Sequence, residues 1–106
     1  MGVRNRRKHD RLKVQFQTMF SLMGLNSPIE GVAENLSQGG AFVKTNYWSN
    51  FQINETAVVA FFLPPSFTGL DETIGLEGTA EIARIDHVSR GIGLRFTKEF
   101  RHFQWI

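Results

Sequence analysis

Hydrophobic and polar residues alternate along the chain from residue 12 onward. The apolar face of this first segment consists of Leu12, Val14, Phe16, Phe20 and Leu22, and the residues between them are mostly polar. A period of two places successive side chains on opposite sides of an extended backbone, with one side packed on a core. The pattern therefore predicts a half-buried strand over residues 12–22.

Several later segments have the same β-type character. Asn26, Ser27 and Pro28 supply a turn before the next strand, and the paired glycines Gly39 and Gly40 interrupt the pattern again. Residues 56–63 are apolar at nearly every position, which is typical of a strand covered on both faces. The strands predicted after the first comprise residues 29–36, 41–44, 56–63, 74–86 and 91–96.

The remaining segments read as loops, apart from the C-terminus. Residues 45–55 are polar and irregular, and Pro64 begins a second loop that extends to residue 72. Over residues 97–106, Thr97 is a candidate N-cap, and Phe100, Phe103 and Ile106 recur at three-residue spacing, so a short C-terminal helix is predicted. Short strands without a crossover helix favour an all-β antiparallel barrel over an α/β sheet.

Composition limits the protein class. A chain of 106 residues is expected to form a single domain, here 1–106, with a barrel over residues 12–96. The absence of cysteine excludes disulfides and thiolate chemistry. No apolar run approaches the roughly 20 residues of a membrane-spanning helix, and no signal peptide is visible. A soluble, cytoplasmic protein is the expectation.

Charge is distributed unevenly along the chain. Residues 1–11, here called the basic leader, contain five basic residues against one acidic residue, a net charge of +4. The other 95 residues contain seven basic and nine acidic residues, a net charge of −2. A flexible basic segment of this density indicates an anionic partner.

Catalytic and metal-binding chemistry finds little support. His9, His87 and His102 have no metal-ligand spacing, and Ser37 lacks the surroundings of a nucleophile elbow. The carboxylate pairs Asp71–Glu72 and Glu77–Glu81 are expected on the solvated surface. With no general base, nucleophile or metal set, the chain is not expected to be an enzyme.

The basic leader holds an R-x-x-x-R motif formed by Arg7 and Arg11, with Arg6 directly before it. Guanidinium groups are always charged, bind phosphate oxygens in a bidentate manner and stack on flat bases. Taken alone, the signal is weak, because a basic N-terminal segment is more often a solvated tail.

An N-x-S-x-x-G motif, formed by Asn35, Ser37 and Gly40, follows at the end of the second predicted strand. In extended geometry Asn35 and Ser37 point the same way and present an amide and a hydroxyl to one polar edge, which Gly40 lets the backbone approach. The alternative is a capped turn in which Asn35 and Ser37 bond their own backbone.

Together the two motifs, 24 residues apart, resemble those of the PilZ family of cyclic di-GMP receptors. Further similarities are Gly40-Ala41-Phe42-Val43 directly after the second motif and Gly91-Ile92-Gly93-Leu94-Arg95-Phe96 near the end. The resemblance covers about residues 6–96. It implies a six-stranded antiparallel β-barrel with a C-terminal helix, which only ten residues remain to form.

The resemblance also implies roles for single residues. Arg7 and Arg11 would bind phosphates and guanine, and Asn35 and Ser37 would read guanine edges. Arg6 stands where a basic residue accompanies binding of two intercalated cyclic di-GMP molecules. The implied ligand-binding set is Arg6, Arg7, Arg11, Asn35, Ser37, Gly39, Gly40 and Arg84, the last of which would pack beside a guanine.

The expected function is a ligand-gated interaction module with no cofactor besides the ligand. Cyclic di-GMP would order the basic leader over the barrel and change the surface offered to an unidentified downstream protein. The main alternative is a small β-barrel that binds nucleic acid through the same leader, although the net acidic barrel makes nucleic acid a poor partner. A PilZ-like adaptor without ligand binding is a third possibility.

Overall fold

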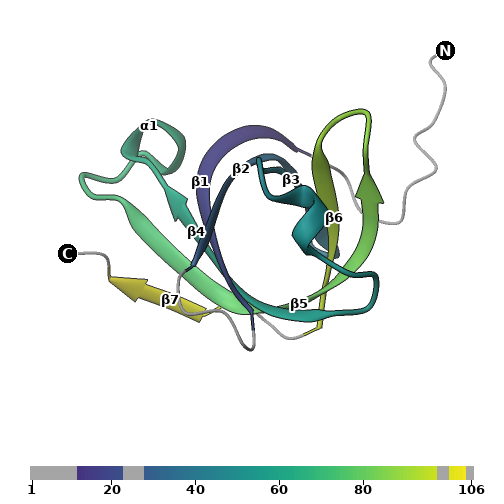
Figure 1. The fold of residues 1–106 in the computed structure, drawn as a ribbon. Coiled ribbons are helices and arrows are strands. Elements are labelled where there is room, and N and C mark those ends of the chain that lie inside the picture. The colour runs from purple at the N-terminus through teal and green to yellow at the C-terminus, as the bar shows by residue number, and fades with distance from the viewer. Residues whose placement is uncertain (1–11, 23–27, 98–100, 105–106) are drawn as a thin grey trace, which may run out of the picture.

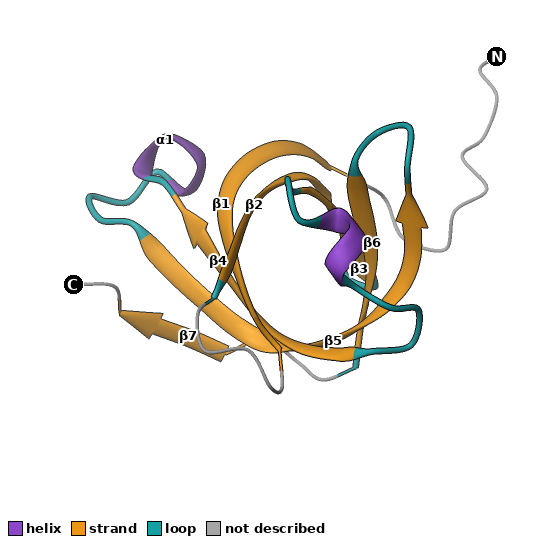
Figure 2. Cartoon of the chain, viewed as in Figure 1, coloured by secondary structure: helices purple, strands orange, loops and turns teal. Residues whose placement is uncertain are grey.

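The computed structural model describes residues 12–22, 28–97 and 101–104, the first and last few of them as backbone only. Figures 1 and 2 show a barrel of strands with two short helical segments. The helical segments are η1 (Trp48–Asn50) and α1 (Pro65–Thr68). The strands are β1 (Leu12–Leu22), β2 (Ile29–Leu36), β3 (Gly40–Lys44), β4 (Thr56–Leu63), β5 (Ile74–Asp86), β6 (Gly91–Phe96) and β7 (Arg101–Gln104).

Within these described ranges, six strands close into an antiparallel barrel in the order β4-β1-β2-β3-β6-β5, and β5 pairs back onto β4. Closure is direct: Gln17 of β1 lies opposite Phe62 of β4, and Leu63 of β4 lies opposite Ile74 of β5. A closed barrel gives each of its strands a neighbour on both sides, although the longer strands extend beyond the paired region. The predicted six-stranded antiparallel barrel is confirmed.

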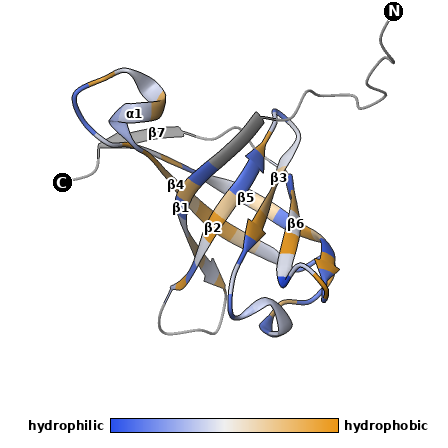
Figure 3. Ribbon diagram, turned by 90° about the horizontal axis from the view of Figure 1, so that it is seen from above, coloured by the Kyte–Doolittle hydropathy of each residue, from blue (hydrophilic) through white to orange (hydrophobic). Residues whose placement is uncertain are grey.

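Phenylalanine fills the barrel interior. Phe16, Phe20 and Phe61 are almost fully buried, and Figure 3 shows hydrophobic and hydrophilic positions alternating along the strands around them. The ring of Phe51, from the loop after η1, meets Phe20 edge to face at 5.2 Å between centroids. Edge-to-face packing lets bulky rings fill a small interior at favourable geometry. Phe16, Phe20, Phe51 and Phe61 therefore form the aromatic part of the core.

Strand β4 corrects one expectation. Its residues alternate between buried and more accessible positions, and Val58 is 42% exposed. The strand is therefore covered on the barrel side, while the opposite side forms part of the outer wall. The apolar run arose because the outward positions also carry apolar side chains, so hydropathy alone could not distinguish one buried face from two.

The two helical segments lie toward opposite ends of the barrel (Figures 1 and 3). Phe67 of α1 contacts Phe16 edge to face at 4.8 Å, near the end where β1 begins. Trp48 of η1 contacts His87, in the turn between β5 and β6, at the same centroid distance. Loops predicted as irregular thus supply aromatic side chains that cover the ends of the core.

The predicted C-terminal helix over residues 97–106 is wrong, because residues 101–104 form strand β7 instead. β6 pairs with β5 only from Ala80 to Asp86, so the first part of β5 has one free edge. β7 occupies that edge and pairs antiparallel with residues 74–77. Hydrogen bonds to an available sheet edge outweigh the weak tendency of so short a segment to form a helix.

Candidate functional site

The topology places the start of β1 beside the second sequence motif. In the register of β1 and β2, Leu12 pairs with Leu36 and Lys13 pairs with Asn35. Arg11 directly precedes Leu12 in the sequence, so the basic leader joins the barrel beside the N-x-S-x-x-G motif. Arg6, Arg7 and Arg11 themselves lie outside the described residues.

Ser37 closes the turn between β2 and β3. Its backbone N–H donates to the Gly40 carbonyl at 2.9 Å, and its Oγ accepts from the N–H groups of Gly39 and Gly40 at 3.3 Å each. The Oγ also donates to the Gly40 carbonyl at 3.3 Å. For Ser37 the capped-turn alternative is the arrangement found, and β2 ends at Leu36, before Ser37. At these lengths the bonds to Oγ are weak.

Backbone packing explains the second glycine of this turn, Gly40. A Cβ on Gly40 would lie 2.0 Å from the Leu94 carbonyl oxygen, so any other residue would push β3 away from β6. The Gly39 carbonyl accepts a 2.9 Å hydrogen bond from the Phe96 N–H, which anchors the turn to the end of β6. Neither glycine adopts a positive φ. Close approach of strands, not unusual backbone angles, requires Gly40.

Asn35 and Arg84 lie in one row across four strands of the outer wall. Asn35 of β2 pairs with Phe42 of β3, Phe42 pairs with Gly93 of β6, and Gly93 pairs with Arg84 of β5. With strands about 4.8 Å apart, the row spans roughly 14 Å of sheet. The register thus joins two predicted ligand-binding residues that are far apart in the sequence.

β-bulges turn both ends of the row outward. Ala33 and Ile82 are completely buried in the barrel, and a regular strand would place Asn35 and Arg84, two residues later, on the same inward side. The register instead shifts by one residue between Ala33 and Asn35 and between Ile82 and Arg84. Each bulge reverses the facing of the residues after it and so brings a polar side chain to the surface.

Phe42 lies in the row between Asn35 and Gly93 and was not among the predicted site residues. Its neighbours in β3, Ala41 and Val43, belong to the core, so its ring lies on the outer side, yet only 7% of it is exposed. The ring lies across Gly91, where a Cβ would come within 2.5 Å of Phe42 Cζ. Glycine in β6 therefore makes the space that the ring occupies.

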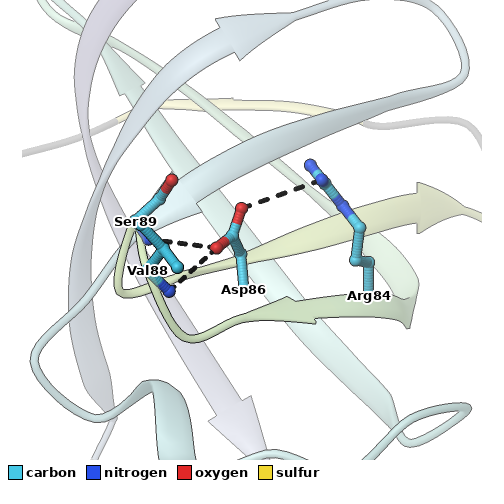
Figure 4. A network of polar contacts seen from close by, with 4 residues as sticks. All are labelled: Arg84, Asp86, Val88 and Ser89. Atoms are coloured by element: carbon cyan, nitrogen blue, oxygen red, sulfur yellow. Dashed lines mark hydrogen bonds and ion pairs between the residues drawn. The ribbon is translucent and has the colours of Figure 1, made fainter.

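Arg84 covers the Phe42 ring. Its Cζ lies 5.3 Å from the ring centroid, within the range of a cation–π interaction, and its Nη1 lies 3.8 Å from Oδ2 of Asp86. The other carboxylate oxygen of Asp86 accepts hydrogen bonds from the N–H groups of Val88 and Ser89, at 3.0 Å each (Figure 4). The hydrogen bond from the Ser89 backbone, more than the nearby Arg84 charge, lowers the pKa of Asp86.

Other predicted surface groups lie apart from this row. Asp71, Glu72 and Glu77 are exposed, as expected, and Glu81 forms an ion pair with Arg95. His87 packs on Trp48, whereas His9 and the side chain of His102 lie outside the described part of the chain. Across the ranges that the structure describes, no group of acidic and histidine side chains could hold a metal ion, and no helix is long and apolar enough to cross a membrane.

The structure also contains a cleft of about 510 Å³. Lys44, Thr45, Ser89 and Arg90 are among its lining residues, but none of the predicted ligand-binding residues is. The row itself is an open surface strip. A ligand held there needs a second element to cover it, and the register places Lys13, two residues after the basic leader ends, beside Asn35 at the edge of the strip.

The sequence contained an overlooked signal for this arrangement. Ala33 and Leu36 both pack toward the core, as do Ile82 and Ile85, although each pair is separated by three positions. An odd spacing between inward residues of a strand requires a bulge. The spacing of Ile82 and Ile85 in the sequence therefore indicates that Arg84 faces outward. The pairing of Phe42 with Gly93 has no such local signal, because it depends on the order of the strands in the barrel.

Comparison with known proteins is consistent with this geometry. A family model described as PilZ domain matches residues 5–102. Among solved structures, the Bacillus subtilis inhibitor of motility MotI/DgrA superposes with a TM-score of 0.71 at 22% identity. The match covers 90% of this chain and 44% of MotI/DgrA, so the chain spans less than half of that protein's length. No match was found among curated proteins.

The similarity to MotI/DgrA shows a shared fold, and the family match extends over most of the chain, including the leader motif from Arg7 to Arg11 and the row from Asn35 to Arg84. The chain therefore belongs to the PilZ domain family, a family of cyclic di-GMP receptors.

Proposed function

We propose that this protein binds cyclic di-GMP on the outer wall of its barrel and couples binding to a change in its surface. The observation that carries the proposal is the pairing of Lys13 with Asn35, which joins the basic leader to the second motif. A doubly anionic dinucleotide is compact enough to be held between the leader and the strip from Asn35 to Arg84. Arg7 and Arg11 bind the phosphates and one guanine, and Arg84 lies against a guanine.

Asn35 and Ser37 read the guanine edges in this proposal. The Ser37 hydroxyl makes only long hydrogen bonds within its own turn, so it can exchange them for shorter bonds to a ligand at little cost. Gly39 and Gly40 keep the turn free of side chains that would block access. The strands behind the turn are held by the barrel, so the polar groups are positioned before the ligand arrives.

Binding has a consequence for the leader. Its positive charges repel one another, and a ligand with two phosphates compensates two of them at once. The leader then closes over the strip and presents a new surface to a downstream protein. The output of the module is this altered surface.

Charge pairing on the barrel argues against the nucleic-acid alternative. Four basic side chains fall within the part of the chain whose side chains are described, and three of them face a carboxylate. The pairs are Lys44–Glu34, Arg84–Asp86 and Arg95–Glu81. A duplex or single strand needs a continuous run of unpaired cations along its backbone, and the described side chains of the barrel wall do not supply one.

Isothermal titration calorimetry with cyclic di-GMP at moderate salt tests the proposal. We expect saturable binding by the wild type and roughly tenfold or greater weakening in Arg7→Ala and Arg11→Ala, since each removes charge-assisted hydrogen bonds worth about 1.5–3 kcal/mol. Arg4→Ala removes the same charge from the leader outside the motif and is the matched control, with a smaller effect. Ser37→Ala is expected to weaken binding by a few-fold.

Two results would overturn the proposal. Absence of binding by the wild type would exclude the ligand, and equal affinities for Arg7→Ala, Arg11→Ala and Arg4→Ala would exclude the motif as the site. Tight binding to single-stranded DNA or RNA with a steep salt dependence, together with indifference to cyclic di-GMP, would favour the nucleic-acid alternative.

A further inference from the structure

We propose that Phe42, Gly93 and Asp86 form a seat that holds the Arg84 guanidinium flat against the barrel and presents its outer face as a platform for one base of the ligand. This inference rests on the proposed function and deepens it. It assigns a positioning role to three residues that neither motif includes.

The floor of the seat consists of the Phe42 ring and of Gly93, which has no side chain. The Phe42 ring lies under the guanidinium, with 5.3 Å between the Arg84 Cζ and the ring centroid. A Cβ on Gly93 would lie 3.4 Å from both Cβ and Nε of Arg84, so the arginine side chain passes directly over this glycine. A residue larger than alanine at position 93 has to displace it.

The edge of the seat is the carboxylate of Asp86. One oxygen is fixed by two hydrogen bonds from the turn at Val88 and Ser89, which leaves the other oxygen aimed at Arg84 Nη1, 3.8 Å away (Figure 4). Because the turn holds Asp86, the ion pair restrains the guanidinium more than an ion pair between two freely rotating side chains would.

The upper side of the guanidinium remains accessible. The Arg84 side chain is 62% exposed although Phe42 lies beneath it and Asp86 at its edge. A planar cation with one face supported and the other open is suited to stack on a purine base. Because its rotamers are already restricted, the Arg84 side chain loses less conformational entropy when the ligand binds.

Substitutions at Gly93 separate the seat from the strand that carries it. Valine is favoured in strands and Gly93 has an ordinary extended backbone, so Gly93→Val is expected to fold, which thermal unfolding checks. Its side chain displaces Arg84, and binding of cyclic di-GMP is expected to weaken about as much as in Arg84→Ala, by roughly three- to tenfold. Gly93→Ala adds a single atom at normal contact distance and should weaken binding less.

The double variant Arg84→Ala/Gly93→Val is the decisive measurement. If Gly93→Val acts only by moving Arg84, the double variant binds no more weakly than Arg84→Ala alone. Ala60→Val, which places the same side chain on β4 outside the row, is the control for a general effect of valine on the outer wall. Arg84→Lys keeps the charge but loses the flat face, and it should bind nearly as weakly as Arg84→Ala.

Phe42→Leu supplies a readout that needs no ligand. The aromatic ring shifts the Arg84 side-chain proton resonances, and nuclear magnetic resonance should show that shift lost in Phe42→Leu. Additive losses in the double variant, or wild-type affinity in Gly93→Val, would overturn the seat while the proposed function stands. Failure of the wild type to bind cyclic di-GMP would overturn both the proposed function and the platform, whatever the resonances show.

Discussion

Ile82 and Arg84 lie on opposite sides of the barrel wall, although only one residue separates them in β5. Ile82 is completely buried in the core, whereas the Arg84 side chain is 62% exposed on the outer wall. The bulge between them inserts one unpaired residue and reverses the facing of the strand. This register shift therefore places Arg84, the only positively charged residue in the row from Asn35 to Arg84, on the outer wall.

Gly40→Ala should destabilise the barrel. The added Cβ would meet the Leu94 carbonyl oxygen at 2.0 Å, and because that atom is backbone, β3 and β6 have to separate. Overpacking of this kind typically costs about 1–3 kcal/mol in the free energy of unfolding. Urea denaturation measures it, with Gly93→Ala, whose Cβ finds normal contacts, as the control. Equal stability of both variants would show that the strands adjust freely.

Asp86 should contribute a pH-dependent part of the stability. Its folded-state pKa is lowered, chiefly by the Ser89 backbone hydrogen bond, below the ordinary value of about 3.9 in the unfolded chain. A lowered pKa means that the contribution is complete above the unfolded pKa and is lost as pH falls through the folded pKa.

Unfolding measurements between pH 2 and 6 can isolate this contribution. Asp86→Asn keeps an oxygen that can accept from Val88 and Ser89 but does not titrate. The stability difference between wild type and Asp86→Asn should be constant above about pH 5 and shrink as pH falls below about 4. A difference that does not change with pH would contradict the assignment.

Arg6 should govern the stoichiometry of ligand binding. If it supports a second, intercalated cyclic di-GMP molecule, calorimetry should give about two ligands per chain for the wild type and one for Arg6→Ala. Two stacked dinucleotides bring four phosphates to the same leader, and Arg6→Ala removes one of the positive charges that compensate them. The variant should therefore lose the second ligand. A stoichiometry of one ligand per chain in both proteins would contradict this role of Arg6.

Removal of residues 101–106 should expose the edge of β5 at residues 74–77. These residues lose their pairing with β7, and an exposed strand edge promotes association with other chains. We expect a lower melting temperature and a concentration-dependent rise in light scattering. Truncation after residue 104, which keeps β7, is the matched control, and identical behaviour of both truncated proteins would show that β7 does not protect the edge.

The strands and the family could be predicted from the sequence because both depend on local patterns. Local patterns of apolar, polar and turn-forming residues predicted residues 12–22, 29–36, 56–63, 74–86 and 91–96 with the bounds that the structure has. The spacing from Arg7 to Arg11 and from Asn35 to Gly40 sufficed to recognise the PilZ motifs. The predicted C-terminal helix was wrong because residues 101–104 pair with a sheet edge formed by residues more than twenty positions earlier, which local patterns do not reveal.

What the tertiary structure alone decided is the row of residues from Asn35 to Arg84 on the outer wall. Phe42 reads in the sequence as one more core phenylalanine, and only the order of β3, β6 and β5 places it between Asn35 and Arg84. Local propensity specifies that a segment is extended, but the partner, the register and the outward face follow from pairing with strands distant in the chain. For that reason the sequence identified the residue types of the proposed dinucleotide site, and the closed barrel determined which of the described ones lie side by side.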